Sequence, residues 1–176
     1  RPRFGRALLT RKSVDTFDDL GIKPEISEAL VSEGIETPTP LQSAAIPVIR
    51  KGNNLFLEAG PGSGLLVAWG TGLLDRIESE GEYPRVVVLC ANVETADRLA
   101  EAMARIAATS EHRVAALGSP WVLPGRAHIL FGTPAGLLAA RAAETVVLDS
   151  VEAVVVDQAQ LMEAAGTLAD VESLFA

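Results

Sequence analysis

Short runs of apolar, β-branched residues alternate along this chain with longer segments in which apolar positions recur at a helical period. Such runs are typical of buried strands in a parallel sheet, and such segments are typical of the helices that cover it. The predicted strands are residues 54–58, 85–91, 113–117, 128–132 and 153–157. The predicted helices are residues 24–32, 40–50, 64–77, 94–107 and 134–142, with a last helix ending near Phe175. The pattern predicts an α/β fold, a mostly parallel sheet flanked by helices on both faces.

Four of the predicted strands end in loops that deserve a chemical interpretation. Ligands of open α/β sheets bind beyond the carboxyl ends of the strands, because the loops there converge on one edge. The loops that follow Glu58, Ala91, Gly132 and Asp157 are therefore the expected places for binding or catalysis.

The loop after the first predicted strand has the spacing of a phosphate-binding loop. Its small residues are Gly60, Gly62, Ser63 and Gly64. Glycines let backbone N–H groups turn toward phosphates, and the positive end of the following helix lies behind them. A working loop continues with Lys and then Ser or Thr, whereas this chain has Leu65 and Leu66. A charge-assisted contact worth roughly 1.5–3 kcal/mol is thus absent, and a glycine turn without any ligand is an equally open interpretation.

Four segments, taken in order, resemble the first lobe of the DEAD-box RNA helicases from Thr16 onward. Residues 16–22 and 34–42 look like the family's Q motif with its upstream aromatic, and residues 45–55 lead into the phosphate loop as they do in that family. The resemblance implies a RecA-like P-loop NTPase fold, ATP or ADP with Mg²⁺ as ligands, RNA as a partner, and a second RecA-like lobe.

The Q-motif resemblance implies an adenine pocket. In the family the motif's glutamine hydrogen-bonds adenine and the aromatic stacks on it, which assigns these roles to Gln42 and Phe17. The residues alone offer another interpretation, because Thr39 and Gln42 have the spacing of a helix capping box and Pro40 fits the first helical position. Both interpretations stay open at this point.

Residues 155–160 resemble the D-E-A-D motif at the end of a strand. The resemblance implies that Asp157 binds Mg²⁺, while Gln158 stands where the family has the Glu that orients and deprotonates the attacking water. An amide cannot accept that proton, and losing a general base typically costs roughly 10²–10⁴ in rate. Without the metal, Asp157 is simply a solvated residue that ends a buried strand.

The segments that face RNA in the family also lack their arginines. Val93 and Gly136 stand where A-P-T-R-E and T-P-G-R have Arg. Phosphate contacts by cations supply most non-specific affinity for nucleic acid. Thr133 and Gly136 remain candidate nucleic-acid contacts, although Thr133 followed by Pro134 also fits an ordinary helix cap.

Charge and cysteine content narrow the class of protein. The net charge is −8, and five basic residues without an acid in residues 1–12 leave −13 for the remainder, which repels nucleic acid. Because Cys90 is the single cysteine, an intrachain disulfide is excluded, which fits a reducing cytoplasm. The longest apolar stretch, residues 64–74, is too short to span a bilayer. We expect a flexible basic tail over residues 1–13 and one lobe over residues 14–176, truncated before its last elements.

These observations predict a degenerate helicase lobe. It would bind ATP or ADP weakly, hold Mg²⁺ poorly through Asp157, hydrolyse ATP slowly or not at all, and serve as a binding or scaffold module with weak RNA contact, a second lobe or a protein partner. The alternative is the N-terminal lobe of an active ATP-dependent RNA helicase whose full-length form supplies the missing groups, with Arg126 or the basic tail replacing the lysine. A third hypothesis is a regulatory domain that contacts a partner through Trp121.

Overall fold

The computed structural model describes residues 15–60, 62–81 and 83–175, so the predicted basic tail lies outside the described residues. At its centre is a four-stranded parallel sheet in the order β2-β3-β1-β4. The strands are β1 (Val86–Leu89), β2 (Val114–Ala116), β3 (Ile129–Gly132) and β4 (Ala153–Val156). Each of the four lies inside one of the predicted strand ranges.

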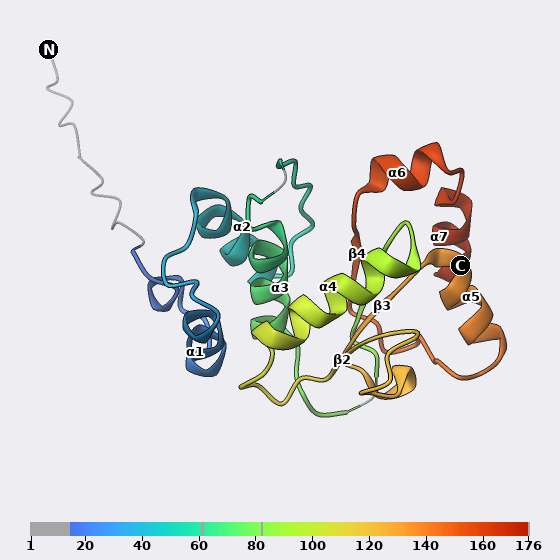
Figure 1. The fold of residues 1–176 in the computed structure, drawn as a ribbon, viewed down its shortest axis with the longest axis horizontal. Coiled ribbons are helices and arrows are strands. Elements are labelled where there is room, and N and C mark those ends of the chain that lie inside the picture. The colour runs from blue at the N-terminus through green and yellow to red at the C-terminus, as the bar shows by residue number, and fades with distance from the viewer. Residues whose placement is uncertain (1–14, 61, 82, 176) are drawn as a thin grey trace, which may run out of the picture.

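Helices cover both faces of this sheet, as predicted (Figure 1). They are α1 (Pro24–Ser32), α2 (Pro40–Arg50), α3 (Leu65–Arg76), α4 (Val93–Ile106), α5 (Pro134–Ala142), α6 (Ala159–Ala164) and α7 (Leu168–Leu174), with single 3₁₀ turns at η1 (Asp18–Leu20) and η2 (Pro124–Arg126). The last predicted helix is therefore two helices. Gly166 separates them with φ +70°, a left-handed conformation that ends a helix and that glycine adopts without strain.

Successive residues of the strands point to opposite faces and build two separate cores. Val86 and Val88 of β1 belong to the core that α1 to α4 cover, and Val87 and Leu89 belong to the core under α5, α6 and α7. All four residues of β1 are buried. The near-continuous apolar runs in the sequence are explained by this burial on both faces.

Helix α3 packs closely against two neighbouring helices through its glycines. A Cβ atom on Gly72 would lie 2.9 Å from a side-chain carbon of Ile49 in α2, and one on Gly70 would lie 2.7 Å from the sulfur of Met103 in α4. The small residues in this apolar helix therefore allow the close approach that places the phosphate loop, at the start of α3, beside α2.

The first predicted strand, residues 54–58, is not a strand in the structure. Leu55 and Phe56 are 42% and 81% exposed, and none of the described strands pairs with this segment. A strand is stabilised by its hydrogen-bonded ladder and by cross-strand packing, so a short apolar run such as residues 55–57 does not suffice where no neighbour is present. The prediction of a fifth strand here was wrong for that reason.

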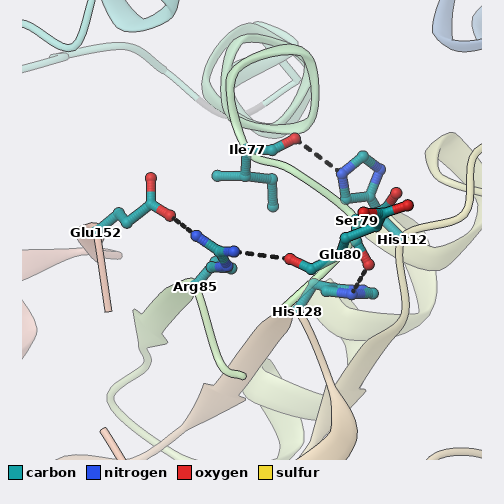
Figure 2. A network of polar contacts seen from close by, with 7 residues as sticks. All are labelled: Ile77, Ser79, Glu80, Arg85, His112, His128 and Glu152. Carbon is teal, nitrogen blue, oxygen red and sulfur yellow. Dashed lines mark hydrogen bonds and ion pairs between the residues drawn. The ribbon is translucent and has the colours of Figure 1, made fainter. Parts of the chain in front are cut away.

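A polar network fastens the amino-terminal ends of the strands to the segment that leaves α3 (Figure 2). Arg85 pairs with Glu152 and donates to the carbonyl of Glu80. The fully buried His128 accepts the backbone N–H of Arg113 at its Nδ1, so its Nε2 carries the proton and donates to the carbonyl oxygen of Ser79 at 2.8 Å. These contacts lie at the edge of the sheet opposite the carboxyl-end loops.

Both histidines of the chain belong to this network, and both are held neutral. The Nε2 of His112 lies 3.1 Å from the carbonyl of Ile77, and the two rings meet edge to face. Burial lowers the pKa of His128 to about 4, with a further contribution from the Arg113 guanidinium, and burial also lowers the pKa of His112. Their role is to hold the chain between α3 and β1 in place.

Candidate nucleotide site

The glycine loop turns the chain sharply into the start of α3. Gly62 and Gly64 both have φ +75°, a left-handed backbone conformation that L side chains rarely adopt, and Gly64 is the residue that caps α3. The backbone N–H of Ser63 donates to the carbonyl oxygen of Gly60 at 3.3 Å. The loop therefore contains two left-handed glycines just before the first residue of α3, Leu65.

Gln42 links the loop to the start of α2. Its side-chain oxygen accepts the N–H of Thr39 at 2.9 Å, and its backbone N–H donates to the Thr39 hydroxyl at 3.3 Å, so the predicted capping box is present. Its Nε2 donates to the carbonyl of Gly64 at 3.2 Å. The amide is 2% exposed, and both of its ends are engaged within the protein.

Phe17, the expected adenine-stacking residue, lies in the core. Its ring is 1% exposed, in the cluster that also contains Leu20, Ile26 and Leu30. Gln42 and Phe17 thus both lie on the α2 side of the phosphate loop, but neither presents an open polar or aromatic face to solvent.

A groove of about 1030 Å³ brings three of the sequence-predicted site residues together. Leu65 from the start of α3 lines it, and so do Asp157 and Gln158 from the end of β4. The start of α3, which follows the glycine loop, and the loop after β4 therefore lie at the same edge of the sheet. Phe17, Gln42 and the loop glycines Gly60, Gly62 and Gly64 are not part of the groove's lining.

Asp157 ends the ladder of β4 and is bound by its own neighbour. Its N–H donates to the carbonyl of Leu89 at 2.9 Å, while its carboxylate accepts the Nε2 of Gln158 at 3.2 Å. Gln158 has φ 52°, an uncommon conformation for a residue other than glycine, and such conformations cluster at functional sites. Leu66 offers no oxygen, and no group of three His, Cys, Asp or Glu side chains gathers at metal-binding distance among the described residues. Asp157 is thus a single carboxylate without a neighbouring hydroxyl, and any Mg²⁺ held there would need nucleotide phosphates and waters for its other ligands.

A comparison with protein-family models matches residues 39–176 to the family described as DEAD/DEAH box helicase, which is most of the chain. The chain belongs to the DEAD/DEAH box helicase family. Among the curated relatives of this DEAD-box lobe, an ATP-dependent RNA helicase DeaD from Klebsiella pneumoniae is 36% identical over 92% of the chain and 26% of the relative. A DEAD-box ATP-dependent RNA helicase CshA from Bacillus cereus is 29% identical over 90% of the chain and 32% of the relative. The lobe spans between a quarter and a third of the length of these relatives.

Solved structures support the fold of the DEAD-box lobe. A DEAD box protein from the hyperthermophile Methanococcus jannaschii matches with a TM-score of 0.80 at 23% identity, over 90% of this chain and 45% of that one. The RNA helicase Prp28 from Chaetomium thermophilum bound to ADP matches with a TM-score of 0.78 at 20% identity, over 92% and 42%. The predicted RecA-like fold, with helices on both faces of a parallel sheet, is thereby confirmed.

The loops of the DEAD-box lobe that would face RNA are capped by their own side chains. Asn92 accepts the N–H of Thr95 at 2.8 Å at the start of α4, and Thr133 accepts the N–H of Gly136 at 3.1 Å at the start of α5. Thr133 and Gly136, the two candidate nucleic-acid contacts, therefore bond to each other, as the helix-cap interpretation expected. Val93, at the position of a family arginine, is 61% exposed.

Arg126 is in the wrong place to replace the phosphate-loop lysine. It belongs to η2, just before β3, and its carbonyl accepts the Nε of Arg113 in the network at the amino-terminal ends of the strands. The glycine loop lies at the carboxyl-end edge, where Leu65 and Asp157 line the same groove. The sequence alone does not show whether a residue that lies between two strands is at the amino-terminal or the carboxyl-terminal edge of the sheet.

Sequence reasoning also missed a contact that shapes the DEAD-box lobe's site. The hydrogen bond from Gln42 to Gly64 joins residues 22 positions apart, and only the tertiary packing of α2 against α3 brings them together. No pattern in the sequence signals it.

Within the part of the chain that the structure describes, no helix is both long and apolar enough to cross a membrane.

Proposed function

We propose that this DEAD-box lobe is degenerate: it keeps the nucleotide-binding fold, binds ATP or ADP weakly, hydrolyses ATP slowly or not at all, and acts as a binding or scaffold module within a longer protein. The observation that carries the proposal is the groove shared by Leu65, Asp157 and Gln158. These are the positions where the family resemblance implies the phosphate-binding lysine, the metal carboxylate and the water-activating glutamate. An aliphatic side chain and an amide stand at two of the three.

The phosphate end of the site supports weak binding. Backbone N–H groups at the start of α3 and the left-handed turns at Gly62 and Gly64 are still suited to a phosphate. Leu65 supplies no cation, and the absent charge-assisted contact corresponds to about ten- to a hundredfold in affinity. The expected nucleotide affinity is therefore low and only weakly dependent on Mg²⁺.

The adenine end of the site supports the same conclusion. Gln42 would have to release Gly64 or the Thr39 N–H to bind a base, and either release breaks a hydrogen bond that the side chain makes within the protein. A hydrogen bond of this kind contributes roughly 0.5–1.5 kcal/mol. Phe17 is enclosed in the core and would have to leave it to stack on adenine.

Partner binding through protein surfaces is supported by exposed apolar side chains. Trp121 and Leu123, on the loop between β2 and β3, are 46% and 73% exposed, although the Trp121 indole N–H is held by the carbonyl of Val114. Aromatic residues held in a fixed orientation are enriched in protein interfaces. The net negative charge of the residues after position 12 disfavours nucleic acid as the main ligand. The buried, unpaired Cys90 is consistent with a reducing cytoplasm.

A reversal of the three substitutions tests the proposal. The variant Leu65→Lys, Leu66→Thr, Gln158→Glu is titrated with ATP by calorimetry, with and without Mg²⁺, beside the parent chain and the control Leu65→Met. We expect the triple variant to bind at least about tenfold more tightly than the parent and to gain a dependence on Mg²⁺. Tight, Mg²⁺-dependent ATP binding by the parent chain would contradict the proposal.

The second candidate is the N-terminal lobe of an active ATP-dependent RNA helicase, and the names of the curated relatives favour it. In that case other parts of a longer protein supply the cation and the general base. RNA-stimulated ATP hydrolysis by the full-length protein, abolished by Asp157→Ala, would support this candidate. If the full-length protein does not hydrolyse ATP, that result supports the degenerate lobe.

A further inference from the structure

A second pocket, here called the helix-end pocket, lies where α2 and α3 end. Its volume is about 440 Å³. Its lining residues are Pro47, Arg50, Lys51, Asp75 and Arg76. The glycine loop lies at the other end of α3, and at a rise of about 1.5 Å per residue the 12 residues of that helix place the two ends roughly 17 Å apart. The helix-end pocket is therefore separate from the phosphate end of the candidate nucleotide site, although Arg76 also lines the far part of the groove.

The helix-end pocket is positive in a chain that is negative. Three of its lining residues are cations and one is an anion, so the lining carries +2 (three minus one), against −8 for the whole chain. The anion, Asp75, is already bound, because its carboxylate accepts the backbone N–H of Lys23 at 2.6 Å and pairs with the Nε of Arg50. Lys51 and Arg76 form no ion pair within the part of the chain that the structure describes. Two cations of the pocket thus lack an anionic partner there.

Arg76 is held in one orientation by the backbone at the end of α2. A Cβ atom on Gly52 would lie 3.3 Å from Cζ, 3.4 Å from Nη2 and 3.6 Å from Nε of Arg76. Because these three atoms of the planar guanidinium are almost equally distant, the guanidinium turns its face toward Gly52. The φ of Gly52 is +76°, so a side chain there is disfavoured by conformation as well as by space. A guanidinium fixed in this way loses less freedom when its N–H edge binds an anion.

The negative ends of the two helices do not outweigh these cations. A charge near a helix terminus changes an equilibrium constant by roughly two- to fivefold, and the last carbonyls of α2 already accept the N–H groups of Gly52 and Asn53. One charge-assisted hydrogen bond to an anion contributes roughly ten- to a hundredfold. An anion between Lys51 and Arg76 would therefore gain more from the two side chains than it loses to the helix ends.

We propose that the helix-end pocket binds the doubly charged phosphate group of a phosphate monoester, held by Lys51 and Arg76. The net charge of the lining matches that of a terminal phosphate near neutral pH. The pocket is larger than a phosphate, so it also has room for part of the molecule that bears the group, either a small metabolite or a phosphorylated side chain of a protein. A polynucleotide is disfavoured, because no lining residue is aromatic and the net negative charge of the chain repels a long polyanion. The inference does not rest on the proposed function.

An NMR titration of the ¹⁵N-labelled chain tests the proposal. The probes are inorganic phosphate, glycerol phosphate and a short peptide with one phosphoserine, added in low-salt buffer at about pH 8, where the phosphate is doubly charged and screening is weak. We expect saturable shifts of the Lys51 and Gly52 amides and of the Arg76 Nε–H, with a Kd for inorganic phosphate on the order of 1 mM. Tighter binding of glycerol phosphate would indicate a metabolite, and tighter binding of the peptide a protein side chain. The amides of Gly62 and Gly64 report separately on the glycine loop.

Matched variants show whether the two cations hold the phosphate. Lys51→Gln and Arg76→Gln should each weaken binding at least about tenfold, because each removes one charge-assisted contact. Arg76→Lys keeps the charge but not the planar fork, so its affinity should lie between those of the parent and Arg76→Gln. The control Arg98→Gln removes an exposed cation of α4 and should bind like the parent. Circular dichroism and thermal unfolding check the fold of each variant, and the exposed Lys51 provides the decisive test if Arg76→Gln unfolds.

Four results would overturn the proposal. The first is the absence of saturable shifts at the helix-end pocket with all three probes. The second is an equal set of shifts with chloride at the same ionic strength, which would show general screening of charge. The third is unchanged affinity in the folded Lys51→Gln variant. The fourth is tighter binding of an oligonucleotide without a terminal phosphate than of glycerol phosphate, which would assign the pocket to nucleic acid.

Discussion

The side-chain amide of Gln42 donates to the carbonyl oxygen of Gly64 at 3.2 Å, so one buried group holds both the start of α2 and the turn of the phosphate loop. The same amide accepts the N–H of Thr39. A residue expected to recognise adenine thus has a structural task that is complete without a ligand. The relationship also makes the loop's geometry dependent on α2.

Removing the donor of this pair should destabilise the protein. Gln42→Glu keeps the oxygen that caps α2 but loses the N–H to Gly64, and it sets a buried carboxylate oxygen against that carbonyl, which still accepts the N–H of Ala68. We expect a loss of roughly 1–3 kcal/mol in the free energy of unfolding, measured in urea. Gln42→Ala, which loses the cap as well, should lose more by roughly 0.5–2 kcal/mol. Equal stability of Gln42→Glu and the parent would show that the bond to Gly64 contributes nothing.

Gly64 should tolerate a side chain less well than a glycine of the same conformation elsewhere. A Cβ at Gly64 would lie 2.3 Å from Nε2 of Gln42, whereas nothing lies within 4 Å of a Cβ at Gly34, and the two have φ of +75° and +77°. In both Gly→Ala variants an alanine must adopt the left-handed backbone conformation, which costs roughly 1–2 kcal/mol. We expect thermal unfolding to show a clearly larger loss for Gly64→Ala. Matching losses would mean that Gln42 moves aside freely.

Stability should fall in acid because of His128. Its folded pKa is lowered to about 4, and its ordinary value is 6.5, so between these values the unfolded state binds more protons than the folded state. The stability that neutral His128 contributes is therefore fully present above pH 6.5 and is lost as the pH falls toward 4. The lowered pKa of His112 acts in the same direction. Urea unfolding from pH 7 to pH 4.5 measures this slope. His128→Gln should flatten it, and an unchanged slope would place the proton uptake elsewhere.

Cys90 should be inert toward thiol reagents in the folded protein. It is fully buried, and burial, with the nearby charge of Asp157, raises the pKa of its thiol to about 12. The thiolate is the reactive form, so labelling requires the protein to open. We expect modification by a coloured disulfide reagent at neutral pH to be slow and to become fast in denaturant. Rapid labelling without denaturant would show that the end of β1 is accessible.

Much of the fold was predictable because its signals are local. The bounds of α1, α2 and α5 agree with prediction, since Pro24, Pro40 and Pro134 each fix the first turn and the residue before Pro134 or Pro40 supplies a side-chain cap. The four observed strands lie inside predicted apolar runs for a similar reason, because burial on both faces requires such composition. The family, too, followed from short motifs in order.

What the tertiary structure decided concerns relationships between distant segments. Residues 54–58 have the composition of a strand but form none, because a strand exists only in a ladder with its neighbour. Phe17 is buried rather than open, and Arg126 lies at the edge of the sheet away from the glycine loop. Composition and spacing fix conformations that a few adjacent residues can stabilise by themselves, whereas strand pairing, burial and the placing of Leu65 and Asp157 along one groove depend on how whole elements pack in space.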